Sequence, residues 1–236
     1  MARTLDEVND IRKEYSDIDI DTYFEPMDIT EEQKEERKTV AEDLWWVLLL
    51  LFALIRESIE SGDLDYAFIY DAFRDSYADA VSKYAELDDY INLYINKFTR
   101  GTLDTTWENL DISNPDSFWT SNRRAIGIAV NQANVILNYE DLLRAIREGK
   151  NCKVWHTQRD NRVRKEHAVL EGKKVGILDF FKVGDSLLQF ACDELHCTNV
   201  RDIANCRCYC KAEYDSKYKM ATEEELQEVM ITNVQP

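Results

Sequence analysis

The residues best suited to bind a metal ion are gathered in the chain after residue 151. All six cysteines and all three histidines lie there, at Cys152, His156, His167, Cys192, His196, Cys197, Cys206, Cys208 and Cys210. Thiolate and imidazole are preferred zinc ligands, and four of them enclose the ion in a structural site. Zinc binding would also add folding free energy to a small domain with a thin core.

The spacing of the last cysteines suggests how such a site is built. Cys206, Cys208 and Cys210 alternate along the chain, so on a strand their side chains share one face. Two of them could hold one ion with His167 and a further ligand from Cys192, His196 or Cys197. We predict a structural zinc site with the ligands His167, Cys197, Cys206 and Cys208. Buried free thiols and disulfides are the alternatives.

A second group of polar residues follows Trp155. Asp160 and His167 could serve as a base and a metal ligand, and the neighbouring arginines could bind phosphate. Alternatively, Asp160 forms a turn after a strand, and Arg162 or Arg164 pairs with acidic side chains. A hydrolytic site needs a nucleophile, a base and an oxyanion stabiliser together. Because only a base can be named, we favour the structural interpretation.

The elements around these residues indicate a small α+β unit. Strand-like segments occupy residues 152–157, 174–178 and 205–211, and turns are expected at Glu171-Gly172 and Gly184-Asp185. Two helical stretches precede them, over 123–138 and 139–148, the second closed by Gly149.

The N-terminal part is expected to form long helices, because the chain has only 7 Gly and 3 Pro. Thr30 and Gln33 have the form of a capping box, so a helix should run from Thr30 to about Glu60 and end at Gly62. Its apolar run over 44–55 is shorter than the roughly 20 residues that span a bilayer. We expect this run to be enclosed by other helices or by a partner.

Aromatic residues recur in steps of four and three from Tyr66 to Phe98, which predicts one packed helix over 64–98 ended by Gly101. Residues 101–121 read as a loop and domain boundary. The predicted fold is therefore α+β and mostly α. It comprises an acidic arm (1–29), a helical domain (30–121), an α+β domain (122–211) and an acidic tail (212–236), which is a short helix from Thr222 or disordered.

Charge is distributed unevenly along the chain, whose formal net charge is −17. Residues 1–121 carry 29 acidic and 11 basic side chains, whereas residues 122–211 carry 11 acidic and 16 basic. Non-specific binding to a phosphate backbone needs clustered Lys and Arg, so any DNA contact must use the second region. The predicted contacts are Arg123, Arg124, Lys173 and Lys174. The first fifteen residues lack the apolar segment of a signal peptide, which favours reduced thiols.

Several of these residues together resemble the minor head protein (Mu F-like head morphogenesis) family of tailed bacteriophages. The resemblance covers about residues 122–211 and rests on the order and spacing of Trp155, Asp160, Arg162, Arg164, His167, Gly172, Asn205, Cys206 and Cys208. The chain lacks the proline that precedes the closing Asn-Cys-Arg-Cys motif in many relatives, which leaves the ligand set open.

The resemblance implies a non-enzymatic virion component near the portal vertex. Such a protein assists head assembly, resides in the host cytoplasm during assembly and then in the virion, and has the portal and other head proteins as partners. It would touch viral DNA weakly and no membrane. The alternative is a metal-dependent hydrolase, a nuclease or toxin-like effector, that uses Asp160 and His167. A third possibility is a helical adaptor that never meets nucleic acid.

Overall fold

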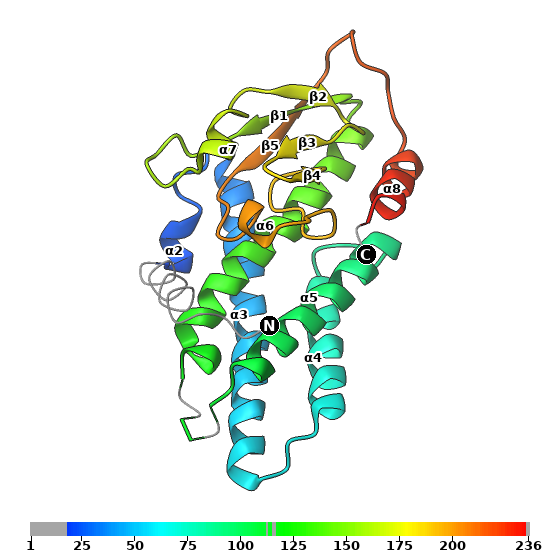
Figure 1. Cartoon of the computed structure of the whole chain (residues 1–236). Coiled ribbons are helices and arrows are strands. Elements are labelled where there is room, and N and C mark those ends of the chain that lie inside the picture. Colours follow the sequence, from blue (N-terminus) through cyan, green and yellow to red (C-terminus); the bar gives the residue numbers. More distant parts are fainter. Residues whose placement is uncertain (1–17, 112, 115–116, 235–236) are drawn as a thin grey trace. The chain divides into compact units, whose positions relative to one another are not determined.

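The computed structural model describes residues 18–111, 113–114 and 117–234 (Figure 1). It divides into two compact units, each made of separate chain segments. The first contains residues 18–25, Ile29–Tyr84 and Ile95–Ala133, and the second contains Pro26–Asp28, Ala85–Tyr94 and residues 134–234. Long helices and a small sheet confirm the predicted fold class, mostly α with an α+β part.

The first unit is helical. It contains α2 (Ile20–Tyr23), α3 (Glu31–Ser61), α4 (Tyr66–Val81), most of α5 (Asp89–Glu108), the short 3₁₀ helix η1 (Phe118–Thr120) and the start of α6 (Asn122–Arg147). Helices α3 and α4 lie side by side and antiparallel (Figure 1). The Thr30 capping box and the left-handed Gly62, with φ of 74°, confirm the predicted ends of α3.

The apolar run of α3 is only partly enclosed. Leu44, Leu48 and Phe52 are fully buried, whereas Trp46 and Leu50 are 58% and 65% exposed. Among the described helices, none combines the length and the apolar character needed to cross a bilayer.

The predicted single helix over 64–98 is wrong. Helix α4 ends at Val81 and α5 begins at Asp89. The Asp88 carboxylate accepts the backbone N–H of Ile91 at 2.8 Å, which caps the new helix. The predicted stop at Gly101 is also wrong, because α5 continues through Gly101 to Glu108 and takes the first part of the predicted loop.

The second unit contains the sheet. Its central strand β1 (Cys152–His156) pairs antiparallel with β2 (Lys174–Gly176) and β5 (Tyr209–Glu213). A separate hairpin joins β3 (Phe181–Val183) to β4 (Ser186–Leu188). The remaining elements are α7 (Lys165–Ala168), η2 (Val200–Asp202), α8 (Glu223–Thr232) and the end of α6.

The first two predicted strands are confirmed, and the third begins later than expected. Cys206 and Cys208 precede β5 rather than lying on it. The predicted turn at Gly184, with φ of 55°, connects β3 and β4, two strands that were not predicted. The two stretches before Gly149 form one helix, α6.

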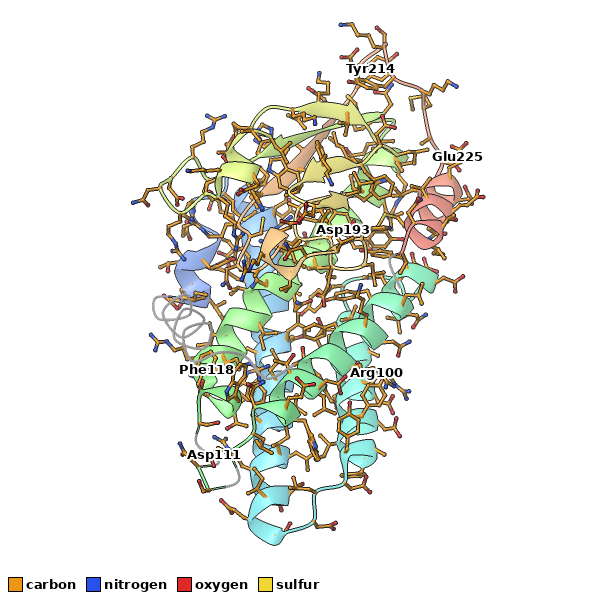
Figure 2. The ribbon with its side chains drawn as sticks, in the orientation of Figure 1. Arg100, Asp111, Phe118, Asp193, Tyr214 and Glu225 are labelled. Atoms are coloured by element: carbon orange, nitrogen blue, oxygen red, sulfur yellow. The ribbon has the colours of Figure 1, made fainter. Side chains whose placement is uncertain are left out.

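The predicted domain limits differ from the limits of the two compact units. Both sides of the boundary at 121/122 lie in the first unit. Most of the predicted arm lies outside the described residues, apart from α2 and the segment after it. In the predicted tail, Thr222 and Glu225 form a capping box that begins α8 (Figure 2).

Candidate metal site

Three segments of the second unit bring the candidate metal ligands together. His167 lies on α7, which follows the loop after β1. Cys206 and Cys208 lie in the segment that leads into β5. Because β5 pairs with β1 in the register Trp155↔Cys210, this segment arrives beside Trp155. The sheet pairing therefore positions the cysteines although they are not in the sheet.

The three donor atoms form a compact buried group. His167 Nδ1 lies 3.4 Å from both Cys206 Sγ and Cys208 Sγ, and the three atoms are all within 4.8 Å of one another. The fully buried Trp155 ring packs edge-on against the His167 ring, with centroids 5.8 Å apart. Apolar packing on this side keeps water from the group.

Hydrogen bonding within the group separates the charges of its members. Hydrogen bonds from the thiols of Cys192 and Cys208 hold the pKa of Cys206 well below its usual value despite burial, and His167 acts in the same direction. Burial opposes protonation of His167, but its hydrogen bond to Cys206 raises the pKa of the imidazole. The hydrogen bond to Cys206, with burial, raises the pKa of Cys208. A thiolate beside a protonated imidazole is an arrangement in which a divalent cation can replace the proton.

The cluster contains three of the four predicted zinc ligands. His167, Cys206 and Cys208 lie together, but Cys197 does not belong to this group. The Cys197 thiol donates to the Asn199 carbonyl at 2.9 Å and accepts from the Ser186 hydroxyl at 3.7 Å. All six cysteines are free thiols.

Asp160 lies in a structural ion pair. Both of its oxygens accept from Arg207 Nη2, at 2.8 and 2.7 Å, and one accepts the Arg162 backbone N–H at 3.0 Å. Burial opposes its ionisation, but these contacts lower the pKa of Asp160. Within the described part of the chain, the metal-binding group of His167 does not include Asp160. The turn interpretation therefore fits this residue better than a role as catalytic base.

The other motif residues also fix the backbone around the cluster. The Gly172 N–H, at φ of 73°, donates to the Trp155 carbonyl at 2.8 Å, and the Arg164 side chain donates to the Ala204 carbonyl. Asn205, immediately before Cys206, has a left-handed φ of 50°. These features lie next to Trp155 and Cys206.

Glu171 is a site residue that the sequence indicated only as part of a turn. Its Oε2 accepts the backbone N–H and hydroxyl of Thr157, at 2.6 and 2.7 Å, and its Oε1 accepts from Nε and Nη2 of Arg159, at 3.2 and 2.8 Å. Partial burial opposes ionisation, but these hydrogen bonds lower the pKa of Glu171 to about 2. The carboxylate thereby holds the end of β1 against the turn before β2.

The predicted DNA contacts are not equally available. Arg124 is only 5% exposed, because its guanidinium donates to Thr106 Oγ1 and to the Trp119 carbonyl. The prediction that it contacts DNA is therefore wrong. Arg123 is exposed in the first unit, whereas Lys173 is exposed in the second. Lys174 forms ion pairs with Glu213 and Asp215, at 2.6 and 3.4 Å.

Two buried polar groups of the second unit have contacts that the sequence did not indicate. The Lys153 ammonium is enclosed and donates to the Ile177 carbonyl at 2.8 Å and to the Gln189 side chain. The His196 ring contacts Asp193 Oδ2 at 2.7 Å and the Met230 carbonyl at 2.9 Å. Figure 2 labels Asp193, which lies among these buried side chains. Among the hydrogen bonds of the described residues, none joins Lys153 or His196 to His167, Cys206 or Cys208.

The chemistry of the cysteine cluster fits zinc. Its donors are one imidazole nitrogen and two sulfurs, which suit zinc better than the oxygen-preferring cations. The comparisons offer no independent assignment: no protein-family model matches the chain, and neither curated proteins nor solved structures give a significant match.

Proposed function

We propose that this protein is a non-enzymatic minor head protein of a tailed bacteriophage that assists head assembly at or near the portal. The observation that carries the proposal is the gathering of the motif residues. Trp155, His167, Cys206 and Cys208 come from segments up to 53 residues apart in numbering and meet in one buried cluster. The residues whose spacing supports the family resemblance are thus the residues that form this cluster.

The bonding of the polar motif residues also favours a structural role over hydrolysis. Asp160 is occupied by Arg207, and the Arg164 side chain by the Ala204 carbonyl. A general base must reach the proton that it removes, whereas the Asp160 carboxylate is held in an ion pair at the turn. A metal-dependent hydrolase that uses Asp160 and His167 is the alternative function.

Zinc would serve this protein as a structural ion. His167, Cys206 and Cys208 would hold it, and the ion would link α7 to the segment before β5. Because the unfolded chain has no preformed site, most of the binding free energy would appear as folding free energy of the second unit.

The exposed face of α3 is the part of the first unit best suited to bind a partner. Trp46 and Leu50 lie one helical turn apart and are largely exposed. Glu42 and Glu57 are exposed on the same face, before and after this apolar pair. An apolar surface bordered by carboxylates complements a helix with apolar and basic residues. We assign this face to the portal protein.

Contact with viral DNA would be weak and restricted to the more basic second region. Lys173 is exposed there, and the acidic first region would repel a phosphate backbone. If replacing Lys173 and Lys174 by Glu leaves DNA retention at low salt unchanged, the proposed contact is refuted.

The assembly role is tested in particles. Virions purified from a strain that carries the gene should contain the protein in a few copies per particle, as measured by quantitative mass spectrometry. Deletion of the gene should reduce the yield of filled heads. Absence from purified virions, together with unchanged head yield, would refute the proposal.

Two further assays distinguish the partner and the alternative function. Trp46→Ser with Leu50→Ser should abolish co-purification with the portal protein of the same phage, whereas Leu187→Ser, an exposed leucine of the second unit, should not. Nuclease activity that requires a metal ion and disappears in Asp160→Asn would favour the hydrolase instead.

A further inference from the structure

We propose that Cys192 is the fourth ligand of the cluster, so that Cys192, His167, Cys206 and Cys208 enclose zinc in a closed Cys₃His site. This inference rests on the zinc ion proposed above. It assigns the remaining coordination position to a residue other than the predicted Cys197.

Cys192 lies next to Cys206 in the buried interior of the second unit. It lies in the segment between β4 and η2 and is only 3% exposed. Its thiol donates to the Cys206 carbonyl at 3.1 Å and also contacts the Cys206 sulfur. Cys206 therefore contacts all three proposed partners, Cys192, His167 and Cys208.

The backbone at Cys192 adopts a left-handed conformation. Its φ is +69°, in the left-handed region that a residue with a Cβ adopts at a cost of about 1 kcal/mol. Glycine would remove that cost, and strained backbone of this kind gathers at functional sites. Asn205 has the same left-handed conformation immediately before Cys206. Cys192 and Cys206 are both buried, and the Cys192 thiol donates to the Cys206 carbonyl.

The other candidates for the fourth position are engaged elsewhere. Cys197 is bonded to Asn199 and Ser186, and both ring nitrogens of His196 have partners in Asp193 and Met230. The Cys192 sulfur is not among the three donors that lie within 4.8 Å of one another, so ligation requires it to leave the Cys206 carbonyl and turn toward them.

The surroundings suit a site with three thiolates. The buried indole N–H of Trp155 has no oxygen or nitrogen acceptor and lies close to the Cys208 sulfur. The positive charge of Arg164 also acts on Cys192 and His167. Three thiolates on zinc leave one negative charge, which a nearby arginine and an N–H donor stabilise.

A small surface pocket reaches the ligands from solvent. Its lining includes Arg162, Arg164 and Arg207 beside Cys206 and Cys208. The pocket offers a route for the ion, but its arginines disfavour the approach of a free cation. We therefore expect slow exchange of the bound ion, as in a structural site closed by four protein ligands.

The test uses the full chain, purified under reducing conditions, with zinc content measured by mass spectrometry. Zinc is then replaced by Co²⁺, whose thiolate charge-transfer absorption reports the number of sulfur ligands. Cys192→Ser should lower that absorption by about one third, since one of three thiolates is lost, and weaken metal affinity by about 100-fold or more. The matched control, Cys197→Ser, should keep both properties of the parent protein.

A second variant covers the case in which Cys192→Ser fails to fold. Cys192→Gly relieves the left-handed strain but also removes a buried thiol, so if Cys192 is only a core thiol the variant should bind metal as tightly as the parent. If Cys192 is a ligand, the glycine variant should bind metal at least about tenfold more weakly than the parent and lose the metal-dependent increase in melting temperature.

Three results would overturn the inference. They are unchanged cobalt absorption in Cys192→Ser, equal losses in Cys192→Ser and Cys197→Ser, or a Cys192→Gly protein that binds metal as tightly as the parent. A parent protein that binds no zinc would refute both the proposed ion and this ligand. The virion measurement would still decide the assembly role separately.

Discussion

Replacement of Lys153 by methionine should stabilise the second unit at neutral and lower pH. The Lys153 side chain is fully buried on β1, and burial lowers its pKa from 10.5 to about 7. Methionine has nearly the same length and carries no charge. The substitution therefore removes the cost of a buried ammonium group while keeping the volume of the side chain.

The size of the effect follows from the two pKa values. The difference of about 3.5 corresponds to about 5 kcal/mol at about 1.36 kcal/mol for each pH unit. The variant also loses the hydrogen bonds to Ile177 and Gln189. The Ile177 carbonyl keeps the Gln189 amide at 3.4 Å, but the Gln189 oxygen loses its donor, at a cost of about 1–3 kcal/mol. The net gain at pH 6 should be about 2–4 kcal/mol.

The sign of the pH dependence is set by which state binds the proton. Between pH 7 and 10.5 the unfolded parent keeps the lysine proton and the folded parent releases it. The stability of the parent therefore rises with pH over this interval. The advantage of the variant should shrink by about 1.4 kcal/mol per pH unit above pH 7 and nearly vanish by pH 9.

The assay is urea denaturation of both proteins at several pH values from 6 to 9, under reducing conditions and at equal metal content. Lys182→Met, at an exposed lysine of β3, is the matched control and should change stability by less than about 0.5 kcal/mol at every pH. A difference between parent and Lys153→Met that does not change with pH, or a variant less stable at pH 6, would refute the reasoning.

Four other substitutions test different parts of the structure. Burial raises the pKa of Glu140 from 4.5 to about 7, so the folded state holds a proton that the unfolded chain lacks, and stability should fall as pH rises from 4.5 to 7. Glu140→Gln should flatten that fall and add about 1–2 kcal/mol at pH 8 after allowance for solvent screening, as measured by denaturant titration. Gly184→Ala should cost about 2–4 kcal/mol, because its φ is +55° and the new Cβ would overlap the Asp202 carboxylate; Gly62→Ala, with φ of +74° and open space, should cost about 1 kcal/mol in the same thermal melts. Arg124→Met should destabilise the first unit by about 2–3 kcal/mol through loss of two buried hydrogen bonds, and an unchanged melting temperature would contradict the assigned contacts.

The sequence predicts those elements whose limits are set by local contacts. The capping box at Thr30 and the left-handed Gly62 define α3 from residues next to it in the chain. The aromatic spacing of 64–98 failed because the steps of four and three continue across the turn between α4 and α5. The signal for the break was Asp88, whose carboxylate caps α5. The packing of these helices overrides Gly101, which remains inside α5.

The sequence predicts that the candidate site consists of histidine and cysteine, but it does not predict which cysteine is the fourth ligand. Histidine and cysteine content pointed to His167, Cys206 and Cys208. Nothing in the spacing distinguishes Cys192 from Cys197, because their positions depend on the β3–β4 hairpin and the loop after it. Lys153 shows the same limit: a lysine on a strand is expected at the surface, whereas Lys153 shares the buried face of β1 with Trp155, and Val154 and His156 on the other face are half-buried.

The central position of β1 has a consequence during synthesis. One edge of β1 pairs with β2, which follows about twenty residues later. The other edge pairs with β5, whose first residue follows the end of β1 by 53 positions. At roughly 5–20 residues per second, the ribosome needs roughly 3–10 s to supply that partner. Throughout this time an edge that includes Trp155 is open to strands of neighbouring nascent chains. Slow translation of residues 157–208 would lengthen this interval and favour aggregation, so the yield of folded protein should depend on codon choice there.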